Sequence, residues 1–178
     1  EGRPGFMATV GRLREVLAAR LTEAGAVNVE KGRALRTSLK VAVVARPLGR
    51  GDGFHGVLDL VTREVVHFVG EQGREVRREP VPADLVEELE LERAELVEVV
   101  ADQDDVLAER FLAGVEVTPE ELRAALRRTA LASRLFPVLT GAALRNVGVQ
   151  MLLDGVVDYL PSPLDVGVTV GHDPEDEH

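Results

Sequence analysis

Residues 135–166, LFPVLTGAALRNVGVQMLLDGVVDYLPSPLDV, are the stretch that decides the fold of this chain. The stretch begins with a short apolar run at residues 135–139, which predicts a strand. A loop of small residues follows. After Gly148, apolar side chains recur at helical spacing until Pro161 ends the helix. This order of strand, small-residue loop and helix favours an α/β fold.

The residues upstream of this stretch predict further strands. A β-branched run at residues 41–44 predicts a strand, ended by Pro47 and the cluster of three glycines that follows it. Two strand-like runs at residues 54–60 and 64–69 flank a short turn and therefore predict a β-hairpin. A third short strand around Val76 is expected to pair with that hairpin.

Helical spacing of apolar residues predicts three more helices, at residues 6–21, 82–101 and 104–112. Gly114 is a natural end signal for the third of these. Thr118-Pro119-Glu120-Glu121 is the strongest local signal in the chain. Thr can cap a helix, Pro suits the first helical position and the second Glu completes a capping box, so a helix to about residue 133 is expected. Residues 22–40 are interrupted by glycines and predict a loop-rich connection.

The composition of the 178-residue chain bounds its class. Hydrophobic residues make up 45 % and charged residues 29 %, as in a globular protein. Cys is absent, which excludes disulfides, thiolate zinc sites and Cys nucleophiles. The net charge of −10 argues against wrapping of nucleic acid, and no apolar run approaches the roughly 20 residues of a membrane span. We therefore expect an acidic, cytoplasmic α/β domain that contacts neither membrane nor nucleic acid directly.

The sequence contains no set of residues that forms a recognisable catalytic centre. It has no GxxxxGK[ST] phosphate loop, no GxGxxG after a strand and no Ser-centred nucleophile elbow. The four His are scattered along the chain and are not spaced as metal ligands. Carboxylates are abundant on the predicted helix at 82–101, but a general acid or base must be held in a cleft. We therefore assign no catalytic residue and no metal ligand.

Charge is distributed unevenly along the chain. Residues 1–50 hold ten Lys and Arg against four Asp and Glu, whereas residues 84–105 hold ten Asp and Glu and a single Arg. One interpretation is an acidic helical face that docks a basic partner. The alternative is a solvated helix surface whose carboxylates only maintain solubility.

Residues 135–166 resemble the end of the GTP-binding domain of the elongation factor G family. The resemblance rests on the strand, the Gly141-Ala142-Ala143 loop, Asn-x-Gly-Val-Gln and Asp-Tyr-Leu-Pro-Ser-Pro. Residues 53–60 resemble the strand that enters the G′ insertion of that family, and residues 81–122 are similar to its helices. Arg3-Pro4-Gly5 resembles the residues just after the guanine-reading Asn-Lys-x-Asp motif. Residues 22–40 are longer than the family pattern and differ from it.

The resemblance implies a partial P-loop GTPase-type core with an inserted α+β subdomain. Residues 1–53 and 133–166 would form the portion of the core, residues 54–132 the G′-like insertion of hairpin and helices, and residues 167–178 a linker or tail. Such a chain would begin after one guanine-specificity motif and stop at the linker to the next domain. It would lack the phosphate loop and both switch regions, so we expect no GTP hydrolysis by this chain alone.

The resemblance also implies a nucleotide-contacting loop, Gly141, Ala142, Ala143 and Leu144. In the family, this loop presents backbone N–H groups to the guanine edge, and its residues are small because the backbone approaches the base closely. The usual second residue is Ser, and Ala142 stands there in this chain. GTP or GDP, with Mg, would be the cofactor of the complete protein, and none is expected for this chain alone. An ordinary strand-to-helix turn is the alternative interpretation of the loop.

The implied partners are the ribosome and the C-terminal domain of the ribosomal stalk protein, whose exposed helices carry lysines. Matching by position points to Glu98 and Asp102, which share a helix face at a spacing of four residues, with Glu95 beside them. The leading hypothesis is a part of an elongation factor G-like translocase. The alternatives are a ribosomal protection paralogue of the same superfamily and a free-standing, non-enzymatic stalk-binding module.

Overall fold

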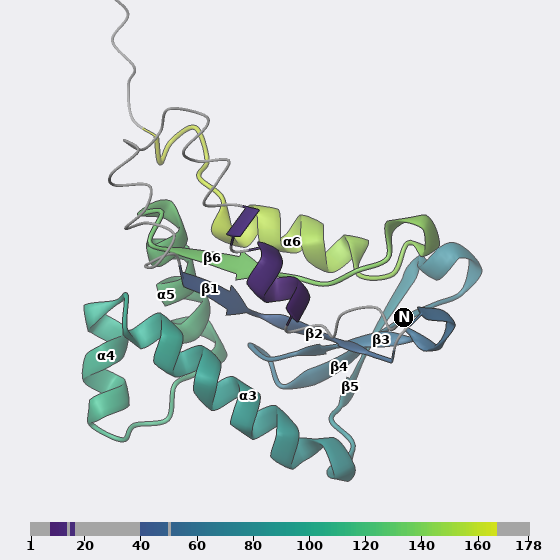
Figure 1. Ribbon diagram of the computed structural model, residues 1–178, viewed down its shortest axis with the longest axis horizontal. Coiled ribbons are helices and arrows are strands. Elements are labelled where there is room, and N and C mark those ends of the chain that lie inside the picture. The colour runs from purple at the N-terminus through teal and green to yellow at the C-terminus, as the bar shows by residue number, and fades with distance from the viewer. Residues whose placement is uncertain (1–7, 14, 17–39, 50, 167–178) are drawn as a thin grey trace, which may run out of the picture.

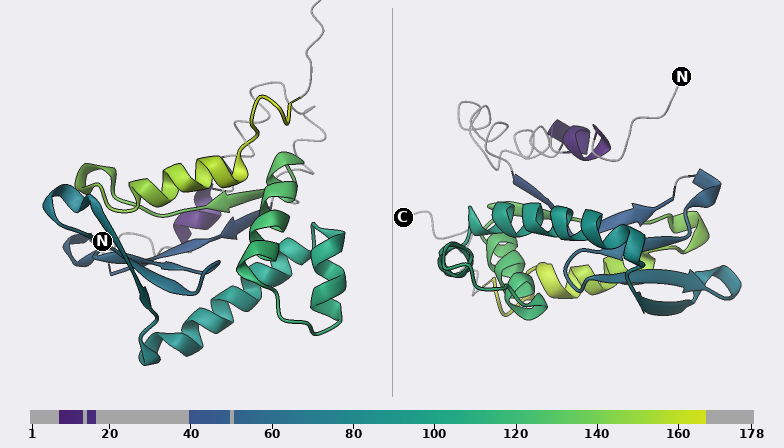
Figure 2. Two further views of the ribbon diagram at one scale, coloured as in Figure 1. Left: turned by 180° about the vertical axis from the view of Figure 1, so that it is seen from behind. Right: turned by 90° about the horizontal axis from the view of Figure 1, so that it is seen from below.

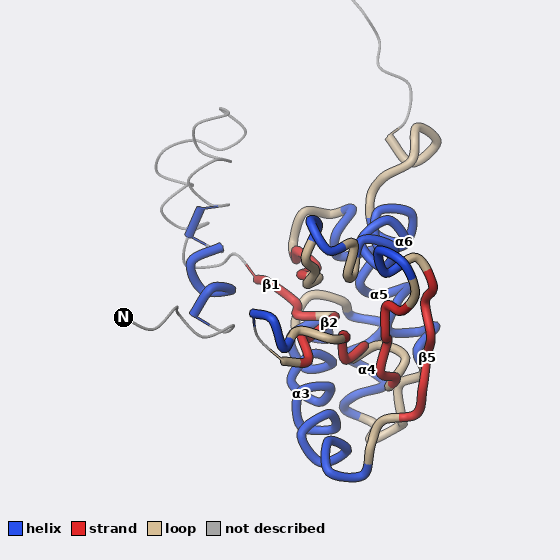
Figure 3. Tube along the Cα trace, turned by 90° about the vertical axis from the view of Figure 1, so that its right-hand side faces the viewer, coloured by secondary structure: helices blue, strands red, loops and turns tan. Residues whose placement is uncertain are grey.

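The computed structural model of the chain describes residues 8–13, 15–16, 40–49 and 51–166. Within this part the protein is an α/β fold, as the sequence predicts, with two sheets and the helices α3 to α6 labelled in Figure 1, besides a helical segment at residues 8–13. Seen from behind, helices α3 and α6 lie on opposite sides of the strands, and the side view agrees (Figures 2 and 3).

The smaller sheet consists of two parallel strands, β1 (Lys40–Val43) and β6 (Leu135–Val138). The strand expected at residues 41–44 is therefore confirmed, but its expected end is wrong. The chain continues directly into β2 (Ala45–Leu48), which includes Pro47 and enters the other sheet. Proline is tolerated there because β2 is an edge strand, so its missing N–H interrupts no central ladder.

The larger sheet is antiparallel and has the strand order β2-β3-β4-β5. The predicted hairpin is confirmed as β3 (Gly56–Asp59) paired with β4 (Glu64–Val69), although its first strand is shorter than the expected 54–60. The third strand is β5 (Glu75–Pro80), which pairs with β4 along its whole length. Because β2 pairs with β3, the proposed domain boundary between residues 53 and 54 runs through this sheet.

The helices begin and end close to the expected residues: α3 (Ala83–Ala101), α4 (Asp105–Leu112), α5 (Pro119–Leu131) and α6 (Val149–Tyr159). The capping box of α5 is present, since the Thr118 hydroxyl accepts from the Glu121 N–H and the Glu121 carboxylate accepts from the Thr118 N–H. Three short 3-10 turns are η1 (Gly51–Gly53), η2 (Glu71–Gly73) and η3 (Ala143–Arg145).

One cluster of buried aliphatic side chains joins both sheets to the helices. Arg93 of α3 crosses this core and is only 3 % exposed. Its guanidinium donates to the carbonyl oxygens of Leu60, Val61 and Val117, at 2.5, 2.7 and 2.9 Å. Burial lowers the pKa of Arg93. The side chain thereby fastens α3 to the β3–β4 turn and to the segment that precedes α5.

Several predicted segments lie partly or wholly outside the described residues. Residues 8–13 are helical, within the helix predicted at 6–21, and the remainder of that prediction falls mostly outside the description. The loop-rich connection at 22–40 is described only at Lys40, which begins β1. The tail at 167–178 and the Arg3-Pro4-Gly5 motif also lie outside.

Candidate functional site

The carboxyl end of α3 exposes the acidic side chains that the sequence singles out. Glu95 and Glu98 lie on the helix with exposed side chains, and Asp102 is the C-cap residue just beyond its last turn. A spacing of four residues keeps Glu98 and Asp102 on one side of the helix. The structure therefore brings the three predicted partner-binding residues together on one exposed surface.

Asp102 already has a partner within the chain. Its carboxylate lies 3.5 Å from the Lys40 ammonium at the start of β1, and the two side chains are 57 % and 39 % exposed. Exposed ion pairs of this kind contribute little to stability because water screens them. Asp102 can therefore exchange Lys40 for an external cation at small cost, whereas Glu95 and Glu98 have no ion-pair partner among the described residues.

The more amino-terminal carboxylates of α3 are engaged with the strands and are not simply solvated. Arg46 of β2 contacts Glu88 at 2.9 Å and Glu92 at 3.1 Å. Arg63 in the β3–β4 turn contacts Glu90 at 3.1 Å. Burial raises the pKa of Glu92 despite the nearby Arg46. The sequence contains no signal for these pairs, because the partners lie far apart along the chain.

The loop that resembles a guanine-contacting segment connects β6 to α6. The Ala142 N–H donates to the Val147 carbonyl at 2.7 Å, and the Val147 N–H donates back at 3.2 Å. One backbone donor of the loop is thus used internally, which the sequence does not reveal. Ala143 and Leu144 are exposed, and Leu144 is fully so. Gly141 is exposed as well, so only Ala142 of the four loop residues is half-buried.

Two glycines allow this loop to fold back on the start of α6. A Cβ on Gly141 would lie 2.8 Å from the Val147 oxygen. Gly148 has φ +79°, and a Cβ there would lie 2.5 Å from the Thr140 oxygen. Both contacts are closer than real Cβ atoms make, so glycine is required at both positions.

A hollow of about 150 Å³ lies between this loop and the first turn of α6. Sites that enclose a cofactor typically have volumes of roughly 300 to 1,000 Å³. The hollow can receive part of a ligand but is too small to enclose a nucleotide. Other segments would have to complete a nucleotide site here.

Side chains just after the loop fasten it to the turns of the larger sheet. The Arg145 guanidinium donates to the carbonyl oxygens of Gly51 at 3.1 Å and Phe54 at 3.0 Å. The Gln150 amide donates to the Gly73 carbonyl at 3.0 Å. The region of the loop is therefore tied to both the β2–β3 turn and the β4–β5 turn.

Two polar clusters near α5 escaped the sequence analysis. Asp104 caps α4 by accepting from the Leu107 N–H and accepts two hydrogen bonds of 2.8 Å from Arg128, which lowers the pKa of Asp104. Tyr159 is buried beside a cavity of about 280 Å³, and this burial, assisted by Asp158, raises its pKa to about 12. Asp is a preferred residue just ahead of a helix, and this signal could have revealed the capping role of Asp104.

Neither a metal-binding cluster nor a membrane-spanning helix is present among the described residues. No group of three or more His, Asp or Glu side chains is arranged to hold a metal ion. None of the described helices is both long and apolar enough to cross a membrane.

Comparisons with known proteins show which proteins the chain is similar to. No protein-family model matches the chain. Over 132 residues, 74 % of the chain, it is 50 % identical to elongation factor G 1 of Geobacter sulfurreducens, and it spans about a fifth (19 %) of the length of that relative. A crystal structure of a Thermus thermophilus protein superimposes with a TM-score of 0.61 at 29 % identity, covering 75 % of this chain and 20 % of that one. Over about three quarters of its length the chain is therefore similar to a part of elongation factor G.

Proposed function

We propose that this chain is the G′-bearing part of a translational GTPase that drives ribosomal translocation in the cytoplasm. In this proposal the carboxyl end of α3 docks the C-terminal domain of the ribosomal stalk protein. The Gly141–Leu144 loop supplies the guanine side of the nucleotide site. The supporting observation is the 50 % identity to an elongation factor G over three quarters of the chain.

The docking role is supported by the electrostatics of α3. Glu95 and Glu98 are exposed and have no ion-pair partner in the described part of the chain, and Asp102 has only an exposed one. A row of carboxylates attracts a lysine-bearing surface over about a Debye length, roughly 10 Å at 0.1 M salt. Such contacts give fast, salt-sensitive association. That behaviour suits a factor that binds to and leaves its partner in every cycle.

The nucleotide role is supported by the shape of the loop after β6. Gly141 and Gly148 allow the loop to fold back on the start of α6, and Gly141, Ala143 and Leu144 are exposed beside a small hollow. GTP or GDP with Mg would bind only where a phosphate loop and switch regions complete the site. The residues of this chain would then contribute orientation of the base, and hydrolysis would depend on those other segments.

Titration of the chain with the purified C-terminal domain of a bacterial stalk protein tests the docking role. The variant Glu98→Lys/Asp102→Lys should lose at least ten-fold in affinity at 50 mM salt. A control with the same charge change on other helices, Glu109→Lys/Asp154→Lys, should bind within two-fold of the parent chain. Equal affinity of the first variant and the parent would refute the assigned surface.

The nucleotide role is tested in a chimaera in which this chain replaces the matching segment of the related elongation factor G 1. The chimaera should bind GDP, and Gly141→Val should weaken that binding at least ten-fold because its side chain would collide with the Val147 carbonyl. Leu164→Ala, at a position 95 % exposed outside the loop, serves as the control. GDP affinity that is unaffected by Gly141→Val would contradict the proposal.

A further inference from the structure

A groove of about 430 Å³ runs between β1 and the outer side of α3. Its lining is mainly aliphatic and comes from the strand, from the helix and from Leu60: Val41, Ala42, Val43, Leu60, Leu91, Leu96 and Val99, together with Arg46, Glu88, Glu92 and Glu95. The volume is sufficient for one or two aliphatic side chains of a partner. Glu95 lines the groove and also belongs to the acidic surface described above, so the two features adjoin.

Leu91 is the aliphatic residue at the centre of the acidic face. It is 63 % exposed, although its neighbours at helical spacing are carboxylates. Glu95 is four residues and Glu98 seven residues further along, so both share its side of the helix. A large exposed apolar side chain framed by charge is typical of the centre of a binding site, where a polar rim surrounds an apolar contact.

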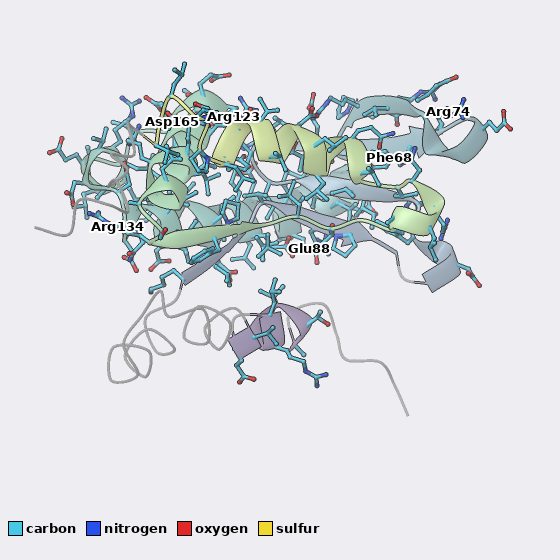
Figure 4. All side chains as sticks on the ribbon, turned by 90° about the horizontal axis from the view of Figure 1, so that it is seen from above. Phe68, Arg74, Glu88, Arg123, Arg134 and Asp165 are labelled. Carbon is cyan, nitrogen blue, oxygen red and sulfur yellow. The ribbon has the colours of Figure 1, made fainter. Side chains whose placement is uncertain are left out.

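Charge on the rim of the groove changes from one wall to the other. On the strand wall, Arg46 lies within ion-pair distance of Glu88 and Glu92 and neutralises part of their charge. On the outer wall, Glu95 has no ion-pair partner among the residues that the structure describes. The arginines of α5 are paired with Asp158, Asp165 and Asp104 and not with this rim. In Figure 4, the labels of Glu88 and Arg123 mark different elements. A partner that enters the groove from outside therefore meets net negative charge.

We propose that the groove receives an aliphatic side chain of the docking partner, which presents it from a helix between lysines. This inference rests on the proposed stalk contact and adds an apolar contact to the charged one. The lysines pair with Glu95 and Glu98 on the rim, and the aliphatic side chain packs on Leu91, Val43 and Val99. This is the helix-in-groove mode of recognition, in which an apolar anchor supplies affinity and the charged rim supplies rate and orientation.

The two halves of this recognition respond differently to salt. The apolar contact is insensitive to ionic strength, whereas the rim pairs weaken as salt screens them. Leu91→Ser should therefore lower the affinity for the stalk C-terminal domain about ten-fold at both 50 and 300 mM salt. Its salt dependence should remain that of the parent chain. Glu95→Gln/Glu98→Gln should instead flatten the salt dependence and lose its effect at 300 mM.

The experiment is a calorimetric titration of the full chain with the stalk C-terminal domain at both salt concentrations. Val99→Thr, which keeps the shape of the side chain and adds a hydroxyl, tests the groove wall and should weaken binding about three-fold. Leu112→Ser is the control, because Leu112 is 83 % exposed on α4 outside the groove. Circular dichroism of each variant confirms that α3 remains helical.

The outcomes separate this inference from the proposed function. The carboxylate variant could weaken binding at low salt while Leu91→Ser and Val99→Thr do not. That result would show that the partner binds through the carboxylates and does not occupy the groove. If the parent chain does not bind the stalk domain even at 50 mM salt, the proposed function fails, and the groove inference fails with it. Loss on Leu91→Ser at both salt concentrations, with Leu112→Ser unaffected, supports the groove.

Discussion

Helices α3 and α5 use their charged side chains in opposite ways. The basic residues of α5 are all paired with carboxylates of the chain: Arg123 contacts Asp158, Arg127 contacts Asp165, and Arg128 contacts Asp104. The carboxylates of α3 are paired only on the side near the strands. Figure 4 shows Arg123 and Asp165 at the same end of the molecule, at the opposite end from Phe68 and Arg74.

The difference explains why a chain with 21 basic residues can present an acidic surface. Cations held by internal carboxylates cancel charge locally and contribute little to the field outside the protein. Glu95 and Glu98 have no such counter-ion in the described part of the molecule, so their field extends into solvent. The net charge of a segment therefore says less about partners than the fraction of its charges that remain uncompensated.

The largest expected loss in the free energy of unfolding comes from removing the carboxylate that pairs with Arg128 of α5. Asp104→Ala removes the cap of α4 and leaves Arg128 without its carboxylate, and Asp104 is only 7 % exposed. Loss of a cap and of charge-assisted hydrogen bonds should lower the free energy of unfolding by about 2 to 3 kcal/mol. Urea denaturation measures the change. Asp102→Ala, two residues earlier and exposed, should change it by less than about 0.5 kcal/mol.

Protonation of Asp104 should lower the stability of the fold by less than its removal does. Its pKa is lowered in the folded state, so its contribution to stability is present above the ordinary Asp pKa of about 3.9 and is lost as pH falls through the folded value. The parent chain should therefore lose more stability between pH 5 and pH 2 than Asp104→Asn, which has no proton to gain there. Equal losses in the two proteins would show that other carboxylates dominate the acid transition.

Arg127 offers a test of a weaker internal contact of α5. Its guanidinium donates to the carbonyl oxygens of Val157, Asp158 and Leu160, which α6 leaves unsatisfied at its end. Arg127→Met should lower the melting temperature by a few degrees, corresponding to about 1 kcal/mol. Arg77→Met, on an exposed part of β5, should leave the melting temperature nearly unchanged. Differential scanning fluorimetry with both variants provides the comparison.

The smallest effect on folding is expected at the exposed face of α3. Glu95→Gln and Glu98→Gln should each change the free energy of unfolding by less than about 0.5 kcal/mol, since neither side chain has an internal ion-pair partner among the described residues. The same measurement on Glu88→Gln, whose carboxylate contacts Arg46, should show a larger loss. A substantial loss for Glu98→Gln would mean that its carboxylate serves the fold.

Most elements of the fold could be predicted because their signals are local. The capping box at Thr118 located the start of α5 within one residue, strand-like runs around a short turn located the hairpin, and helical spacing located the helices. The continuation of the chain into β2 was not predicted, because Pro47 was expected to end the strand. An edge strand tolerates this proline, and only the pairing with β3 shows which edge β2 occupies. The burial of Arg93 was missed for a similar reason, since its partners are carbonyl groups 24 to 33 residues away.

The candidate site likewise has residues that the sequence predicts and contacts that it does not predict. The acidic residues Glu95, Glu98 and Asp102 follow from helical spacing together with the family resemblance, and the structure places them on one exposed surface. The Lys40–Asp102 contact and the groove beside Leu91 depend on how β1 packs against α3. No local pattern encodes that packing.

The hydrogen bonds from Arg145 and Gln150 to the two turns have a mechanical consequence. A displacement of the segment that follows Ala142 must either carry both turns with it or break three hydrogen bonds, each contributing roughly 1 kcal/mol. The four paired strands between these turns resist bending, and β5 leads directly into α3. These hydrogen bonds and the paired strands thus form a continuous connection from the loop to the amino end of α3.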